Sequence, residues 1–203
     1  MIADLERASG RPVSHKTFQR LETFAHRLRA ENQRQNLVAR STLDQLWDRH
    51  ILDSAQLVRF EPQPGASWAD IGSGAGLPGI VVACLVEGPV ALVEPRRLRA
   101  EFLRETVEAL SLNATVECAK AERINGKFDV ITARAVASLS KLLGITYHLS
   151  HRGTVWALPK GKNAQSELAE AQRAWQGAFH VEQSVTDAGS FIVVGVGVRA
   201  KAR

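Results

Sequence analysis

The sequence predicts an α/β fold: a mostly parallel seven-stranded sheet that ends in an antiparallel hairpin and follows an N-terminal helical extension. After a break rich in proline and glycine, short apolar runs alternate with amphipathic segments, the pattern of a parallel sheet covered by helices. Near the C-terminus the apolar runs 179–186 and 190–198 are separated only by residues 187–189. So short a link joins antiparallel strands, so the sheet should end in a hairpin.

Two helices are expected in the extension, which spans residues 1–60. Apolar residues recur at helical spacing over 14–34, and the first residue of that segment is a serine, which suits an N-cap. A second helix with a broad apolar face is expected over 41–58. The proline-rich segment 61–65 then breaks the chain. The sheet domain, 61–203, is expected to form a single compact unit with the extension.

Strands and helices are expected to alternate through the sheet domain. Strand predictions rest on short apolar runs and helix predictions on wider apolar spacing. The expected strands are 67–71, 89–94, 114–118, 128–133 and 153–158, and the expected helices are 77–87, 96–111, 138–149 and 163–176. Five parallel strands closed by a hairpin form the Rossmann-like arrangement of the class I methyltransferases that use S-adenosylmethionine.

The composition, 45% hydrophobic and 23% charged residues, is that of a globular protein. No apolar run approaches the roughly 20 residues that cross a bilayer, and acids stand where a signal peptide carries bases, so we expect a cytoplasmic protein without a membrane partner. The net charge of +5 favours a polyanionic partner such as nucleic acid. Cys84 and Cys118 have apolar neighbours and no C-x-x-C spacing, so both are expected in the core, and no metal site is predicted.

A glycine-rich stretch from Gly72 to Gly79 predicts a cofactor loop. The preceding strand must turn sharply into a helix that Pro78 helps to start, and glycines let the backbone approach a ligand closely. Gly74, Gly76 and Gly79 spell the G-x-G-x-x-G pattern of dinucleotide sites, with an acid, Glu94, 20 residues after the first of them. A nicotinamide-dependent oxidoreductase is therefore one alternative.

Two details favour S-adenosylmethionine over a dinucleotide. Asp70 places a carboxylate at the strand end, where it suits the ammonium group of a methionine moiety better than a pyrophosphate. Gly72 and Ser73 also lengthen the loop beyond the dinucleotide fingerprint, in which the strand runs directly into the first glycine.

Five blocks of sequence, taken together and in order, are more specific than the glycine loop alone. They are Asn36-Leu37, Arg49-His50-Ile51-Leu52-Asp53-Ser54, Asp70 to Gly79, Arg134-Ala135-Val136-Ala137-Ser138-Leu139 and Lys160-Gly161. On these blocks the chain resembles the bacterial small-subunit (16S) ribosomal RNA guanine-N7 methyltransferases, also called glucose-inhibited division protein B. Two departures are that Glu94 stands where aspartate is common and that Pro159 precedes Lys160 where some members lack a proline.

The resemblance implies methyl transfer from S-adenosylmethionine to N7 of one guanine in small-subunit ribosomal RNA, with that RNA or the ribosomal subunit as partner. A methyltransferase acting on another RNA or on a small molecule stays an alternative. The cofactor-binding residues expected are Gly72, Gly74 and Gly76 through their backbone, Leu77 near the methionine end, Asp70 facing the amino group, Glu94 on the ribose hydroxyls, Ala121 and Glu122 beside the adenine, and Arg134 on the carboxylate or an RNA phosphate.

No catalytic acid or base is expected, because guanine N7 carries an in-plane lone pair and no proton. Arg134 and Lys160 are expected to position the reactants. The expected RNA contacts are Arg49, His50, Lys160 and Lys162, although Arg49 and His50 suit a structural role equally well. The oligomeric state is expected to be monomeric.

Overall fold

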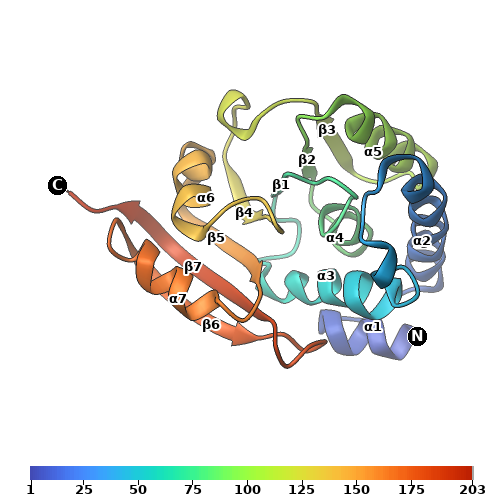
Figure 1. Cartoon of the computed structure of the whole chain (residues 1–203), viewed down its shortest axis with the longest axis horizontal. Coiled ribbons are helices and arrows are strands. Elements are labelled where there is room, and N and C mark those ends of the chain that lie inside the picture. The colour runs from blue at the N-terminus through green and yellow to red at the C-terminus, as the bar shows by residue number, and fades with distance from the viewer. Residues whose placement is uncertain (203) are drawn as a thin grey trace.

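A seven-stranded mixed sheet, ordered β3-β2-β1-β4-β5-β7-β6, forms the centre of the protein (Figure 1). The structure is a computed structural model, and it describes residues 1–202. The strands are β1 (Trp68–Ile71), β2 (Val90–Val93), β3 (Ala114–Glu117), β4 (Phe128–Thr132), β5 (Ser150–Lys160), β6 (Trp175–Gln183) and β7 (Phe191–Ala200). Strands β1 to β5 are parallel, and β7 runs antiparallel to both β5 and β6. The predicted fold class is confirmed.

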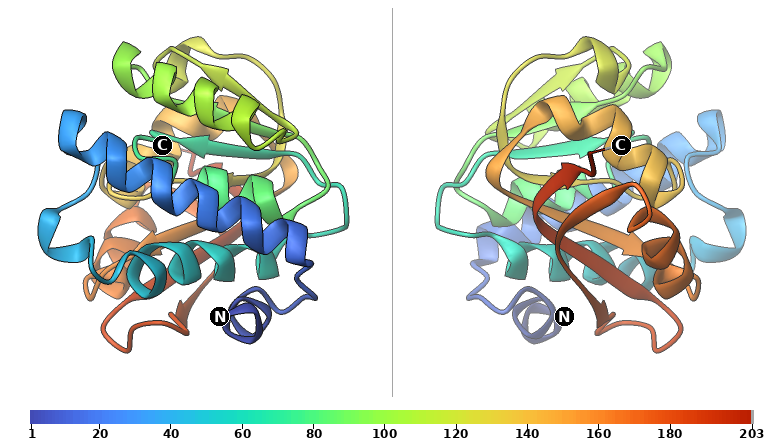
Figure 2. Two further views of the ribbon diagram at one scale, coloured as in Figure 1. Left: turned by 90° about the vertical axis from the view of Figure 1, so that its right-hand side faces the viewer. Right: turned by 90° about the vertical axis from the view of Figure 1, so that its left-hand side faces the viewer.

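Helices cover both faces of the sheet. The α-helices are α1 (Ile2–Ser9), α2 (His15–Gln35), α3 (Asp53–Ala55), α4 (Gly79–Leu85), α5 (Arg97–Ala109), α6 (Leu139–Thr146) and α7 (Ala164–Ala171). The shorter turns are η1 (Arg40–Thr42), η2 (Trp47–Leu52), η3 (Gln56–Phe60), η4 (Ala121–Arg123) and η5 (Tyr147–Leu149). Helices α2, α4 and α5 lie on one face, where α2 crosses the view in Figure 2, left, and α6 and α7 lie on the other. Within residues 1–202, no helix combines the length and apolar character that spanning a membrane requires.

Alternate residues of the central strands enter two separate cores. Trp68 and Val130 pack with residues of α2 and α4, whereas their neighbours Ala69 and Ile131 pack with residues of α6. This is the two-residue period of a strand whose side chains point to opposite faces. The same period places Asp70 on the α4 face of the sheet, which decides what its carboxylate can reach.

The N-terminal segment agrees with the sequence at one helix and differs at the other. Helix α2 begins where predicted, and Ser14 Oγ accepts a hydrogen bond from the Thr17 N–H at 3.1 Å, as an N-cap should. The continuous helix predicted over 41–58 is wrong, because the segment divides into η1, η2, α3 and η3. The turn η2 is π-helical, and the fully buried Leu46 and Ile51 are five residues apart, the spacing of a π-helical turn.

The last strands begin and end differently from the prediction. The helix predicted over 163–176 ends at Ala171, and β6 already begins at Trp175. The Trp175 ring packs on Tyr147 with the ring centroids 5.6 Å apart, so this contact holds the start of the strand against the body of the protein. The connection to β7 spans 184–190 and not three residues, although the antiparallel pairing itself is confirmed.

The two cysteines have different environments. Cys84 is buried in α4 as predicted, and its burial raises the pKa of the thiol to about 12. Cys118 is exposed, so its assignment to the core is wrong. It follows β3, which is an edge strand whose residues are exposed or only half-buried.

Gly79 begins α4 at a point where the helix, β1 and β2 meet closely. A β-carbon there would overlap the Leu92 Cδ2 and Asp70 Oδ2 atoms. We expect Gly79→Ala to lower the free energy of unfolding by about 1–3 kcal/mol through overpacking, measured by urea denaturation. Gly144→Ala in α6 is the control, because its β-carbon would meet only Trp175 at 3.8 Å and alanine favours a helix. Equal stability of the two variants would contradict the packing described.

Candidate functional site

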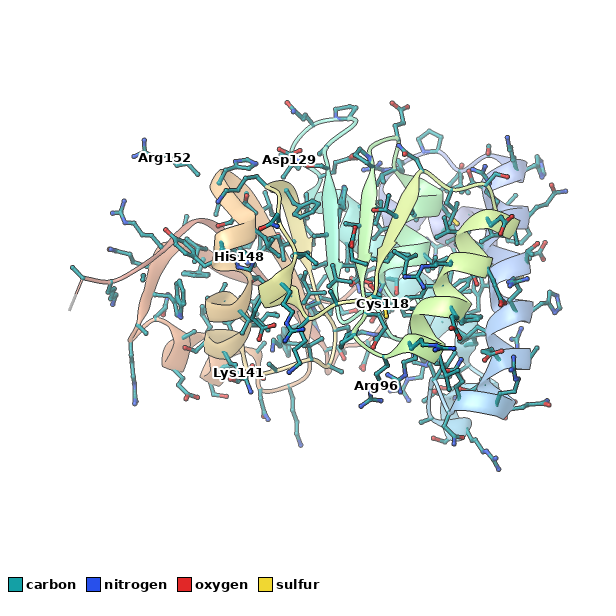
Figure 3. The ribbon with its side chains drawn as sticks, turned by 90° about the horizontal axis from the view of Figure 1, so that it is seen from above. Arg96, Cys118, Asp129, Lys141, His148 and Arg152 are labelled. Atoms are coloured by element: carbon teal, nitrogen blue, oxygen red, sulfur yellow. The ribbon has the colours of Figure 1, made fainter. Side chains whose placement is uncertain are left out.

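Two neighbouring cavities open at the carboxyl edge of the parallel strands. The Glu94 cavity, about 410 Å³, is lined among others by Gly72, Glu94, Arg96, Ala121, Glu122 and Lys141. The Lys160 cavity, about 330 Å³, is lined among others by Asp53, Arg134, Pro159, Lys160, Glu167 and Phe191. Ala135 and Ala137 line both cavities, so the chain segment after β4 separates them. Figure 3 shows Arg96 and Lys141 at this edge of the sheet, and Asp129 and Arg152 at the opposite edge.

The loop after β1 has the backbone conformation that its glycines predict. Gly72, Gly74 and Gly76 all have positive φ, at 71°, 50° and 82°. Gly72 also lies against the segment after β4, because a β-carbon on it would be 2.6 Å from Val136 Cγ2. Any side chain at position 72 would therefore push the loop after β1 away from the segment after β4, and both of these line the Glu94 cavity.

Glu94 joins this loop to the end of β2. Its side chain is 3% exposed, and Oε2 accepts a hydrogen bond from the Gly74 N–H at 2.9 Å. Oε1 accepts from the Arg96 N–H at 2.8 Å. A carboxylate oxygen can accept more than one hydrogen bond, so Glu94 retains acceptor capacity toward the cavity that it lines.

Asp70 lies beneath the loop and does not line either of the two cavities. It is 1% exposed, and Oδ2 accepts a hydrogen bond from the Gly79 N–H at 3.0 Å. Among the described residues Oδ1 has no hydrogen-bond partner. Burial raises the pKa of this carboxyl to about 7. The Asp70 carboxylate thus contacts the start of α4 and is not among the groups that line the cavity in which a cofactor amino group was expected.

Arg134 follows β4 and lies between carboxylates. Its Nη1 is 3.7 Å from Asp53 Oδ2. Burial lowers the pKa of the guanidinium, while the nearby charges of Asp53 and Asp70 raise it. His50 is half-buried, with Nε2 2.9 Å from Thr42 Oγ1, and burial, Arg134 and Arg49 lower its pKa to about 4. His50 is therefore neutral at pH 7 and adds no further positive charge beside Arg134.

Lys160 is held by its neighbours within the protein. Its ammonium group donates to the Ala137 carbonyl at 3.0 Å and to Glu167 Oε2 at 2.9 Å. The same Glu167 oxygen accepts from the Leu139 N–H at 2.9 Å. These contacts fix the segment between β4 and α6, which forms the wall shared by the two cavities.

The structure therefore separates the predicted site residues into four groups. Gly72, Glu94, Ala121 and Glu122 line the Glu94 cavity; Arg134 and Lys160 line the Lys160 cavity; Asp70, Gly74, Gly76 and Leu77 are buried beneath or within the loop; and His50 is half-buried while Arg49 and Lys162 are exposed. The sequence assigned no role to Asp53, Lys120 or Lys141. Asp53 stands in a block that carried the family resemblance, whereas single exposed lysines such as Lys120 and Lys141 give no signal.

Most of the chain matches known proteins of one kind. The family model described as rRNA small subunit methyltransferase G matches residues 17–190. The ribosomal RNA small subunit methyltransferase G of Zymomonas mobilis is 46% identical over 198 residues, which cover 93% of this chain and 90% of the relative. The protein of the same name from Sphingopyxis alaskensis is 48% identical over 188 residues, covering 91% and 80%.

Solved structures share the fold at low sequence identity. The ribosomal protein L11 methylase of Lactobacillus delbrueckii subsp. bulgaricus aligns with a TM-score of 0.58 at 15% identity, over 76% of this chain and 79% of its own. TYW2 of M. jannaschii, solved in complex with AdoMet, aligns with a TM-score of 0.54 at 17% identity, over 74% of each chain. Together with a SAM-dependent methyltransferase from Aquifex aeolicus, at a TM-score of 0.58 and 16% identity over 75% of this chain and 92% of its own, they identify a class I methyltransferase fold.

Asp70 gives the stability of the protein a pH dependence of known sign. Its folded pKa of about 7 lies above the ordinary aspartate value of 3.8, so the folded state holds the proton more tightly and stability falls as pH rises from about 4 to about 7. Asp70→Asn removes this loss. We expect the stability of Asp70→Asn relative to the natural protein to rise across that range, by at most about 1.4 kcal/mol per pH unit, in urea denaturation at constant ionic strength.

His50 supplies a control of opposite sign. Its folded pKa of about 4 lies below the ordinary histidine value of 6.5, so it contributes stability above pH 6.5 that is lost as pH falls toward 4. The stability of His50→Asn relative to the natural protein should therefore fall as pH rises over this range. A pH-independent difference for both variants would show that neither group is perturbed as described.

Proposed function

Because this chain belongs to the rRNA small subunit methyltransferase G family, we propose that it transfers a methyl group from S-adenosylmethionine to N7 of one guanine in small-subunit ribosomal RNA. The observation that supports this most directly is the pair of cavities that meet across residues 135–137 at the carboxyl edge of the sheet. Ligands of open parallel sheets bind at this edge. Two adjoining cavities suit a reaction between a cofactor and a separate acceptor.

The Glu94 cavity fits S-adenosylmethionine in size and in chemistry. Its volume of about 410 Å³ lies in the range of small-molecule sites. The Gly72 backbone leaves room for the methionine moiety, Glu94 and Glu122 offer carboxylate acceptors for hydroxyl and amino groups, and Ala121 and Ile145 offer apolar surface to a purine. When bound, the cofactor supplies a sulfonium methyl: the N7 lone pair forms the new N–C bond while the S–C electrons go to sulfur.

The residues of the chain then act by positioning. No proton leaves N7, so no general base is needed, and alignment of the reactants can contribute about 7–11 kcal/mol in favourable cases. Lys160 and Glu167 fix residues 135–137, which border both cavities at the place where the two reactants must meet, and Arg134 supplies a fixed positive charge. We propose that Asp70 maintains the conformation of the glycine loop, because its carboxylate accepts a hydrogen bond from the Gly79 N–H.

Exposed basic residues around the cavities support an RNA substrate. Arg96, Lys120 and Lys141 lie at the Glu94 cavity, and the exposed Arg49 and Lys162 lie close to the Lys160 cavity in space or in sequence. Phosphate contacts of this kind fix the register of an RNA without reading its bases. One chain lines both cavities, so we propose that the protein acts as a monomer. The reaction needs no metal ion. We further propose that it takes place in the cytoplasm, on the ribosomal substrate.

Purified small and large ribosomal particles, incubated with the protein and labelled S-adenosylmethionine, test the proposal. We expect label in small-subunit RNA alone, at one N7-methylguanine that chemical cleavage at the modified base locates. Large particles serve as the control. Methylation only of small molecules would refute the RNA substrate, and tight binding of a nicotinamide cofactor with no binding of S-adenosylmethionine would favour an oxidoreductase.

Substituting two basic residues at opposite edges of the sheet distinguishes a direct contact with RNA from an effect of net charge alone. Lys141 lies at the carboxyl edge and Arg152 at the opposite edge, and both are exposed (Figure 3). Each phosphate contact steepens the salt dependence of binding through counterion release. We expect Lys141→Gln to reduce the slope of log affinity against log salt by about 1, measured by filter binding to small-subunit RNA, and Arg152→Gln to leave it unchanged. Equal slopes for the two variants would place the RNA elsewhere.

A further inference from the structure

We propose that Asp53 recognises the Watson–Crick edge of the target guanine in the Lys160 cavity, which makes it the residue that selects guanine over other bases. This inference rests on the proposed function and extends it from the methyl donor to the acceptor. The argument depends on how the carboxylate is held, on what lines the cavity, and on which edge of the base must stay free.

Asp53 has one occupied oxygen and one available oxygen. Oδ1 accepts hydrogen bonds from Gln56 Nε2 at 2.8 Å, Thr186 Oγ1 at 3.0 Å and Ser184 Oγ at 3.2 Å. These donors come from two distant parts of the chain and fix the carboxylate. Oδ2 accepts no hydrogen bond from the described residues, and Arg134 Nη1 at 3.7 Å lies beyond hydrogen-bond length. This oxygen is therefore free to accept from a ligand.

The rest of the Lys160 cavity suits the flat face of a base. Pro159, Phe191 and Ile192 form apolar wall, and an aromatic ring such as that of Phe191 is a surface on which unpaired bases stack. The Lys160 ammonium group is already bound to Ala137 and Glu167. The cavity thus combines apolar surface with a carboxylate acceptor whose second oxygen is available.

A carboxylate acceptor matches guanine and no other common base. Guanine presents two adjacent donors, N1–H and the N2 amino group, and the free Oδ2 of Asp53 has two lone pairs with which to accept from both. Adenine and cytosine present an unprotonated ring nitrogen at the corresponding position, which a carboxylate repels. Uracil has one N–H between two carbonyl oxygens, so it too meets like charge beside its single donor.

Recognition of this edge leaves the reacting atom free. Guanine N7 lies on the Hoogsteen edge, away from N1 and N2, so a base held by Asp53 has its N7 lone pair unengaged. Asp53 also lines a third cavity, with Arg49 and Asp187, in which residues 135–137 take no part. Asp53 is not among the residues that line the Glu94 cavity, so a guanine held by Asp53 in the Lys160 cavity can present N7 toward residues 135–137, where the two cavities meet.

The test compares guanosine with inosine, which lacks the N2 amino group, at the mapped position of reconstituted small-subunit particles. Two quantities are measured: the single-turnover methylation rate, and the dissociation constant of the RNA in the presence of S-adenosylhomocysteine. We expect the natural protein to favour guanosine about 5-fold to 150-fold, the range of a good base-edge contact. Asp53→Asn keeps an acceptor for Gln56, Ser184 and Thr186. It should nevertheless lower the rate of guanosine methylation and bring the guanosine-to-inosine ratio of single-turnover rates close to one.

Thr186→Val is the matched control, because it removes one donor to Oδ1 and leaves Oδ2 in place. Its guanosine-to-inosine ratio should equal that of the natural protein, even where its stability is lower. The natural protein alone already tests the contact with the N2 amino group, whatever the stability of Asp53→Asn. Equal use of guanosine and inosine by the natural protein, or an unchanged ratio in Asp53→Asn, overturns the role of Asp53. Failure to methylate guanosine particles at all would instead overturn the proposed function.

Discussion

The pairing of β1 with β4 at the centre of the sheet is the constraint on which the carboxyl edge depends. β1 has β2 on one side and β4 on the other, so the chain leaves β1 in one direction and later returns to its other side. The register aligns Asp70 with Thr132, which brings the loop after β1 against the segment after β4. That segment, 135–137, becomes the common wall of two cavities. Under the proposed function, hydrogen bonding between two central strands therefore sets the position of the methyl donor relative to the base that accepts the methyl group.

The same pairing brings Arg134, after β4, near the buried Asp70 of β1, and unpaired buried charges are costly. Arg134 lies near the carboxylates of Asp53 and Asp70, and the three could not all remain ionised without a net negative charge. Burial resolves this by raising the pKa of Asp70 to about 7, while the lowered pKa of His50 keeps the imidazole neutral. The cluster thus stays close to electrical balance.

The sequence predicts best what neighbouring residues determine. The strand alternation, the glycine loop and the Ser14 cap are local patterns, and all three agree with the structure. The division of the segment 41–58, the early start of β6 and the exposure of Cys118 depend on packing and on strand order, which no local pattern contains. Asp53 is the clearest case, because its carboxylate is fixed by Ser184, 131 residues away. The sequence assigned Asp53 no role, whereas its contacts place it in a cavity wall.

The two cavities differ in how they are built, and this difference bears on where substrate choice resides. The residues lining the Glu94 cavity lie between 71 and 145, within the parallel strands and their connections. The Lys160 cavity also needs Asp53 from before the sheet and Phe191 from its last strand. Gln56 links the N-terminal segment to the connection before that strand, because it accepts from the Val185 N–H at 2.9 Å and donates to Ser184 Oγ at 2.9 Å. The L11 methylase shares the fold over 76% of this chain at 15% identity, a likeness that extends to the fold alone. Under the proposed function, an acceptor site closed by the extension and the hairpin can therefore change while the central strands keep their arrangement.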